Sequence, residues 1–288
     1  MKDFITANTS DNIPQEKNGR ILVWHDEFDG KALNNQNWRM SRSMNCEGRI
    51  YDNSEKNLRV ENNNLHMQIH RCRDTYSNPE GVVTRDTMNF KYGYLEMRAK
   101  VPYRHCAWPS FWLLGNTYFH DGNIGWFTEV DVFEVFSSED SAFPNIHKWG
   151  KPGHEQLPGG EEDNLYRGYR FENPETLNDE YHVYGFEWDE HDMKFYVDDV
   201  CYYSVPIDER CSFVSERYPT TEGFHEPLYI LLNNEMFTEQ STYKPLGTAA
   251  TPEDPMPIDY YVDWVRLYQY KDNERIYSND EISAAANK

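Results

Sequence analysis

Apolar and polar residues alternate with a period of two through most of the chain between residues 20 and 271. In residues 65–70, Leu65, Met67 and Ile69 alternate with histidine and glutamine. The same alternation recurs at 92–101, 182–188 and 261–270, and residues 193–205 have the pattern of a hairpin that turns at Asp198–Asp199. Successive side chains of a strand point to opposite faces, so this pattern predicts strands with one buried face.

Turn-forming residues separate these segments, and the connections lack the dozen-residue amphipathic helices that a βαβ fold needs. The turn segments are 62–64, 80–81, 121–123 and 158–160. We therefore predict an all-β protein with antiparallel strands, and at 288 residues a single two-sheet sandwich is favoured over two domains. The predicted domain spans residues 20–271, after an N-terminal arm at 1–19 and before a C-terminal tail at 272–288. Residues 145–174, rich in Gly and Pro, are predicted to form a long irregular loop with a functional role.

Composition narrows the classes of partner. The net charge is −21, from 49 acidic and 28 basic residues, which argues against nucleic acid or an anionic membrane surface as a partner. No apolar run approaches the roughly 20 residues of a membrane helix, so we expect no membrane insertion. Aromatic residues make up 15% of the chain, which raises the prospect of aromatic side chains in a binding site. We also expect a monomer.

The five cysteines are irregularly spaced and match neither a disulfide framework nor a CxxC metal motif. A bond between Cys201 and Cys211 is the one pairing considered. Residues 1–19 are polar and lack the apolar core of a signal peptide. We expect a secreted or cell-surface protein whose export signal has been removed, with an intracellular protein as the alternative.

Three acids interrupt one apolar segment, at Glu129, Asp131 and Glu134. Burying charges costs several kcal/mol unless they are paired or neutralised, so such a cluster often marks a site. In a regular strand Glu129 and Asp131 share a face and Glu134 points away. We predict that a β-bulge at Val132-Phe133 returns Glu134 to the face of the other two.

Two carboxylates on one wall suit retaining glycoside hydrolysis, in which one is the nucleophile and the other the acid and then the base. A calcium site and a solvent-facing acidic strand remain alternatives for the same cluster. Nearby tryptophans favour catalysis, because flat rings pack against the apolar faces of sugars. We expect Trp108 and Trp126 to bind substrate, and Trp112 to pack in the core.

The motif Glu129-Val-Asp131-Val-Phe-Glu134 resembles the bulged E-x-D-x-x-E signature of glycoside hydrolase family 16. Further blocks over residues 20–271 resemble the same family, at 22–30, 90–100, 108–115, 182–188, 195–198 and 262–268. The resemblance implies a β-jelly-roll sandwich of two curved antiparallel sheets, of the concanavalin A-like type, and a retaining endo-hydrolase of a β-linked polysaccharide. By position, Glu129 would be the nucleophile, Glu134 the acid/base and Asp131 an assisting acid.

The resemblance also implies further site residues. His147, Arg85 and Glu235 become candidates for substrate binding, and Asp263 with Glu27 for a structural calcium ion. No cofactor is implied for the reaction.

The substrate is less determined. The Trp-Pro-x-Phe-Trp block at 108–112 resembles glucanases and favours β-1,3- or mixed-linkage β-1,3(4)-glucan. Glu235 lies where glucanases often carry a glycine-rich segment, which favours a β-galactan hydrolase of the agarase or porphyranase type. A non-catalytic, carbohydrate-binding sandwich is the remaining alternative.

Overall fold

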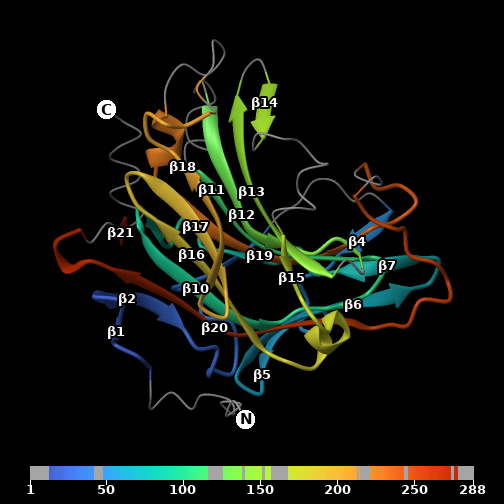
Figure 1. The fold of residues 1–288 in the computed structure, drawn as a ribbon. Coiled ribbons are helices and arrows are strands. Elements are labelled where there is room, and N and C mark those ends of the chain that lie inside the picture. Colours follow the sequence, from blue (N-terminus) through green and yellow to red (C-terminus); the bar gives the residue numbers. More distant parts are fainter. Residues whose placement is uncertain are drawn as a thin grey trace.

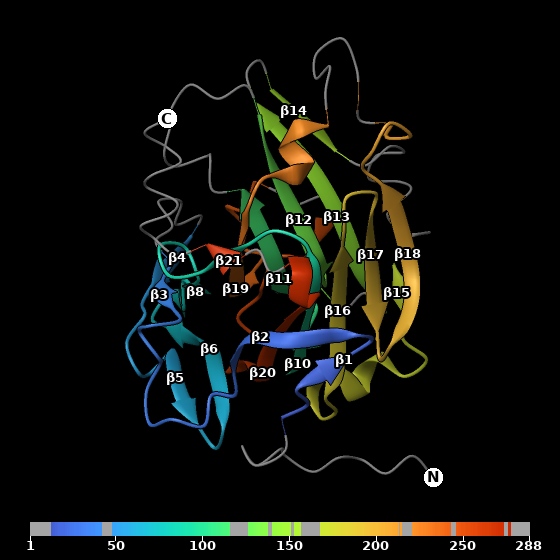
Figure 2. The same cartoon turned by 90° about the vertical axis from the view of Figure 1, so that its left-hand side faces the viewer.

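The structure is a computed structural model that describes residues 13–41, 48–115, 126–137, 140–150, 153–156, 168–212, 214, 221–242, 246–273 and 276–277. Two sheets lie against each other as layers, and their long strands bend along their length (Figures 1 and 2). Helix occurs in the described ranges as short 3₁₀ turns, among them Pro174–Asn178, Glu222–His225 and Lys271–Asn273. The predicted all-β jelly-roll sandwich is confirmed.

The first sheet has the order β18-β17-β16-β10-β20-β6-β7-β4, with β1 on β2, β2 on β20 and β5 on β6. Its pairs are antiparallel except β4–β7. Its strands are β1 (Glu16–Lys17), β2 (Arg20–Asp26), β4 (Arg49–Tyr51), β5 (Leu58–Glu61), β6 (Asn64–Cys72), β7 (Thr75–Asn78), β10 (Gly93–Lys100), β16 (His182–Trp188), β17 (Asp192–Val197), β18 (Val200–Pro206) and β20 (Ile258–Gln269).

The second sheet has the order β14-β13-β12-β11-β19-β8-β3, with β15 on β13, β9 on β19 and β21 on β9. The long strands β11, β12 and β13 run side by side through it, in green in Figure 1. Its strands are β3 (Arg39–Met40), β8 (Val82–Val83), β9 (Asn89–Phe90), β11 (Ala107–Gly115), β12 (Trp126–Glu134), β13 (Ser141–Gly150), β14 (Gly153–Gln156), β15 (Tyr169–Arg170), β19 (Leu228–Met236) and β21 (Ile276–Tyr277).

One large apolar core lies between the sheets and follows the predicted alternation. Leu65 and Met67 of β6 and Leu95 and Met97 of β10 are fully buried in it. The second sheet supplies every other residue of its long strands, such as Phe111, Leu113, Val130, Ile146, Ile230 and Leu232. Since strand side chains alternate, the intervening residues of β11, β12, β13 and β19 must point away from this core.

The predicted hairpin is also present. Strands β17 and β18 pair across Asp198 and Asp199, whose φ angles of 49° and 64° are those of a tight primed turn. Such a turn matches the twist of the strands it joins.

Other segments differ from the sequence-based prediction. Residues 145–150, expected in an irregular loop, continue β13, which pairs with β12 and β14. Cross-strand pairing with β12 overrides the local Gly and Pro signals. Strand β1 lies within the expected arm and β21 within the expected tail, and both pair with neighbouring strands.

Two further expectations can be compared with the structure. Cys201 and Cys211 are not joined by a disulfide, so the considered bond does not form. No helix in the described ranges is long and apolar enough to cross a membrane.

Candidate active site

The acidic segment forms strand β12, and its pairing is interrupted at the predicted place. Towards β13, Asp131 pairs with Asn145 but Glu134 pairs with Phe143, so three residues of β12 advance against two of β13. The pairing with β11 shifts at the same point, between Phe111 and Trp112. The β-bulge at Val132-Phe133 is confirmed.

The bulge determines which side chains of β12 face the core and which face away from it. Val130, Val132 and Phe133 are all at most 2% exposed and belong to the core between the sheets. Two consecutive residues therefore face inward, which a regular strand does not allow. As a result Glu134 returns to the face that carries Glu129 and Asp131.

Hydrogen bonds and close contacts show that the three acids share one face. The Trp108 indole donates to Glu134 Oε1 at 2.8 Å, and the Trp149 indole donates to Glu129 Oε2 at 3.0 Å. Nε2 of His147 lies 3.2 Å from Asp131 Oδ2 and 3.8 Å from Glu129 Oε1. These partners come from β11 and β13, the two strands on either side of β12.

Burial raises the pKa values of the three carboxyl groups. Only 19% of the Glu129 side chain and 5% of the Asp131 side chain are exposed. Burial raises the pKa of Glu134 to about 8, helped by the charge of Asp131 and opposed by the hydrogen bond from Trp108. Burial likewise raises the pKa values of Glu129 and Asp131, which interact as a pair. Three carboxylates so close together cannot all be ionised at neutral pH at low cost.

The contacts distinguish Glu129 from Asp131. His147 lies near both carboxylates, whereas the Trp149 indole donates to Glu129. Within the described residues no hydrogen bond reaches Asp131 Oδ2, although this atom is buried. A hydrogen-bond donor favours the ionised form of a carboxyl group, so the Trp149 indole favours the ionised form of Glu129.

The expected substrate-binding residues divide into two groups. Trp108, His147 and Glu235 lie on the face of the acids, since Trp108 and His147 contact them and Glu235 pairs with Trp108 across β11 and β19. Arg85 follows β8, three strands from β12, and forms an ion pair with Asp86 at 3.8 Å. The structure therefore does not bring Arg85 to the acids. The Trp126 side chain lies outside the described residues.

Trp112 was expected in the core, and this expectation is wrong. It pairs with Asp131 across β11 and β12, so it lies on the acid face, and its indole donates to Asn233 at 2.6 Å. Its neighbours Phe111 and Leu113 are the residues that enter the core. The sequence shows that the side chains of β11 alternate between two faces. Which of the two faces points into the core depends on the strands that pair with β11.

Three contributors were missed at the level of sequence. Trp149 falls in the segment that was expected to be an irregular loop, although its spacing of two from His147 was a usable signal. Arg49 lies near Glu235, with Nε 3.3 Å from Oε2, and the Tyr51 hydroxyl donates to Glu235 Oε1 at 2.9 Å. No local pattern marks Arg49 or Tyr51, which come from the other sheet.

The expected calcium ligands are already paired with guanidinium groups. Both oxygens of Glu27 accept hydrogen bonds from Arg266, at 2.9 and 2.7 Å, and Asp263 pairs with Arg98. Calcium needs six or more converging oxygens. Glu27 and Asp263 do not fit that requirement, because arginine cations occupy their ligand positions.

The acid cluster itself could hold a cation. One ligand atom from each of Glu129, Asp131 and His147 lies within 4.8 Å of the others. The geometry is therefore compatible with metal binding as well as with acid–base chemistry.

Comparison with known proteins identifies a family. The model of the family described as "Beta-porphyranase A-D, GH16 domain" matches residues 23–270. Glucan endo-1,3-beta-glucosidase A1 of Niallia circulans is 27% identical over 275 residues, covering 87% of this chain and 38% of that protein. Beta-glucanase of Rhodothermus marinus is 26% identical over 292 residues, covering 93% of this chain and 90% of that protein. The laminarinase catalytic domain of Thermotoga maritima has a similar fold, with a TM-score of 0.66 at 22% identity over 87% of this chain and 98% of that one.

Proposed function

The chain belongs to glycoside hydrolase family 16, and on that premise we propose that it is a retaining endo-glycoside hydrolase of a β-linked polysaccharide. The observation that carries the proposal is the bulge in β12, which places Glu129, Asp131 and Glu134 on one face. Retaining hydrolysis needs one ionised and one protonated carboxyl group on the same wall. A binding protein has no need to bury three acids together.

In the proposed reaction, the carboxylate of Glu129 attacks the anomeric carbon while the carboxyl of Glu134 protonates the departing glycosidic oxygen. The resulting glycosyl ester on Glu129 is then hydrolysed by water, and Glu134 takes up the proton of that water. Asp131 holds a proton next to the nucleophile and limits the charge of the cluster. The Trp149 indole orients Glu129, and the Trp108 indole orients Glu134. These steps use only side chains, so the proposal requires no cofactor.

The substrate that we propose is β-1,3-glucan or mixed-linkage β-1,3(4)-glucan. The names of the relatives from Niallia circulans and Rhodothermus marinus support this choice. Indole rings at 108, 112 and 149, on the face of the acids, suit the apolar faces of glucose units.

A β-galactan is the second candidate. It is favoured by the description of the matching family, which is that of beta-porphyranases. The ion pair of Arg49 with Glu235 next to Trp108 adds charged groups to the face of the acids. Such groups suit a more polar or charged sugar better than an unsubstituted glucan.

A panel of laminarin, lichenan, agarose, porphyran and carrageenan, assayed for new reducing ends and product lengths, tests both candidates. We expect internal cleavage of laminarin or lichenan, and no product from the Glu129→Gln variant. Cleavage of agarose or porphyran instead would select the galactan candidate. Binding without product from any of the five would identify a carbohydrate-binding sandwich and overturn the enzymatic proposal.

We further propose that the protein acts outside the cell or at its surface, as a monomer with one catalytic domain at residues 20–271. A polysaccharide that is too large to enter a cell must be hydrolysed outside the cell. Light scattering after size-exclusion chromatography measures the mass against the 34.2 kDa of the chain. Activity in the culture medium or on intact cells tests the location.

A further inference from the structure

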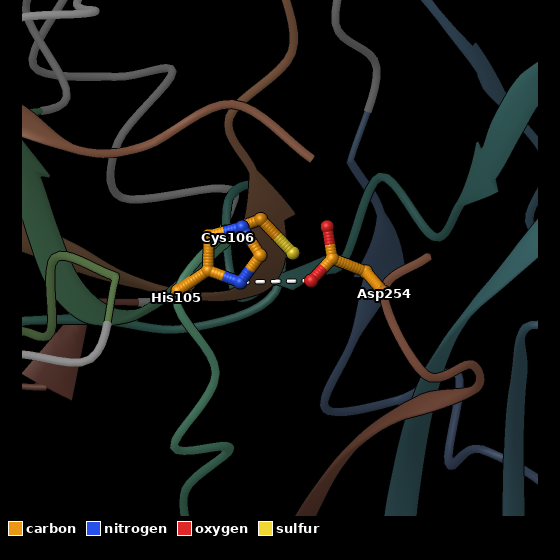
Figure 3. Close-up of side chains that lie close together, drawn as sticks. All are labelled: His105, Cys106 and Asp254. Atoms are coloured by element: carbon orange, nitrogen blue, oxygen red, sulfur yellow. Dashed lines mark ion pairs between the residues drawn. The ribbon is translucent and has the colours of Figure 1, made fainter. Parts of the chain in front are cut away.

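A second group of metal-ligating side chains lies apart from the three acids. His105 and Cys106 immediately precede β11, and Asp254 belongs to the turn 251–254 before β20. One ligand atom from each lies within 4.8 Å of the others. Figure 3 shows the imidazole of His105 facing the carboxylate of Asp254, with the sulfur of Cys106 beside the space between them.

The spacing is close to that of a metal's coordination shell. His105 Nδ1 lies 2.8 Å from Asp254 Oδ1. Zinc bonds of about 2.0–2.3 Å in tetrahedral geometry separate neighbouring ligand atoms by roughly 3.3–3.8 Å. The pair would need to open by less than about 1 Å, with loss of the proton between the two groups, to accept an ion.

Surrounding contacts fix the ligands in place. The backbone amide and the hydroxyl of Thr251 both donate to Asp254 Oδ2, which leaves Oδ1 directed at His105. Arg71 donates to the carbonyls of residues 251 and 254 and so ties the turn to β6. Cys106 is 1% exposed, and its carbonyl accepts the amide of Phe237 at 2.8 Å. Such supporting contacts pre-organise metal ligands.

We propose that His105, Cys106 and Asp254 form a binding site for a divalent transition metal of the zinc class. Imidazole nitrogen, thiolate sulfur and carboxylate oxygen are the three ligand types of zinc sites, whereas calcium takes oxygen only. Three protein ligands leave the fourth position to water. The His105 side chain is 37% exposed, which gives an ion a route from solvent.

The bound ion joins two distant parts of the chain. It ties the turn 251–254 to the start of β11, the strand on which Trp108 follows Cys106 by two residues. Burial and the charge of Asp254 raise the pKa of the Cys106 thiol to about 12, so metal binding must displace this proton and is weakened by that cost.

Titration of the metal-free, reduced protein with Co²⁺ alone tests the site. The expected result is one equivalent of Co²⁺ with a thiolate-to-cobalt charge-transfer band in the near ultraviolet, displaced by Zn²⁺, and a higher Tm with Zn²⁺. The band should vanish in Cys106→Ser. It should require at least about tenfold more Co²⁺ in His105→Gln and in Asp254→Asn.

Cys201→Ser is the matched control, because Cys201 is an exposed free cysteine with no part in the proposed site. Its band should match that of the unmodified protein. A missing band in the unmodified protein, a band that survives Cys106→Ser, or one unaffected by His105→Gln would overturn the proposal. His105→Gln keeps the test valid if the buried Cys106→Ser variant does not fold, since His105 lies partly at the surface.

Discussion

At the scale of single residues, the three carboxylates of β12 differ in the donors that reach them. Glu134 receives the Trp108 indole and Glu129 the Trp149 indole, while Asp131 Oδ2 is buried without a hydrogen bond among the described residues. One type of side chain can thereby carry an acid, a nucleophile and a proton reservoir. The proposed roles follow from these contacts rather than from the acids alone.

The Glu129→Gln variant is expected to lose activity and gain stability. Loss of the proposed nucleophile should lower kcat by at least about 10³-fold. Burial and the charge of Asp131 raise the pKa of Glu129, so the folded state binds more protons than the unfolded state above the ordinary carboxyl pKa, and folding is opposed as pH rises towards about 8. Removing the acid should therefore raise Tm by about 2–5 °C at pH 8 and by less at pH 4–5.

Differential scanning calorimetry at the two pH values makes the comparison. A lower Tm for Glu129→Gln, together with weaker cation binding, would instead identify the acid cluster as a structural metal site.

The Trp108→Phe variant is expected to shift the alkaline limb of the pH–rate profile upward. The Trp108 hydrogen bond lowers the pKa of Glu134, which burial raises to about 8, and activity falls as this acid loses its proton. Without the donor the pKa rises further, by about 0.5–1 unit. The measurement is kcat/KM between pH 5 and 10.

Trp112→Phe is the matched control, because Trp112 lies on the same strand and face but donates to Asn233. Equal shifts in both variants would contradict a specific effect of Trp108 on Glu134.

At the scale of the element, the bulge in β12 depends on two consecutive residues that both enter the core. Phe133 is 0% exposed and packs on Tyr184 of the first sheet, with ring centroids 4.2 Å apart. The apolar burial of Val132 and Phe133 therefore holds the extra residue of β12 in place. The arrangement of the three acids is in this way coupled to the core between the sheets.

Truncation of this anchor, Phe133→Ala, should cost about 3–5 kcal/mol of unfolding free energy. Denaturant unfolding measures the loss. Ile50→Ala, at a side chain that is 48% exposed, is the comparison and should change stability by less than about 0.5 kcal/mol. A loss below about 1 kcal/mol in Phe133→Ala would show that the bulge does not depend on this packing.

Strands β5, β6 and β20 meet at a buried histidine. His66 lies between Glu61 and Asp259, with Nδ1 2.6 Å from Glu61 Oε1 and Nε2 2.7 Å from Asp259 Oδ1. Burial acts to raise the pKa of Asp259, but hydrogen bonds from His66 and Gln68 lower it overall. A carboxyl whose pKa is lowered on folding stabilises the protein above its unfolded pKa, and this stabilisation is lost as pH falls.

The Asp259→Asn variant should therefore lower Tm at pH 7, with a difference that shrinks towards pH 3. Thermal unfolding across this range is the measurement, and Asp29→Asn, at an exposed position, is the control. A difference that stays constant with pH would assign the loss to packing instead of charge.

At the scale of the whole molecule, the two sheets have different structural roles. The first sheet closes the core and carries the arginine ion pairs of Glu27 and Asp263, while the second presents the acids on its outer face. The first sheet therefore supports the second, which carries the acids, and it adds Arg49 and Tyr51 beside Glu235.

The arginine pairs predict that calcium leaves stability unchanged. Arg266 and Arg98 already neutralise Glu27 and Asp263, so adding millimolar Ca²⁺ to the metal-free protein should shift Tm by less than about 1 °C. A clear rise that disappears in Asp263→Asn would show that calcium displaces the arginine and would contradict this assignment.

The sequence by itself determined the period-two strands, the all-β class and the bulge between Asp131 and Glu134, because alternation and side-chain parity are local properties of the chain. It left open which face of each strand pointed into the core, and for that reason Trp112 was predicted on the wrong face. Only the tertiary structure brought Trp149 to Glu129, arginines to Glu27 and Asp263, and His105 with Cys106 to Asp254. These contacts join residues on different strands and turns, and the order and register of the strands, set by burial of the whole core, decide which residues meet.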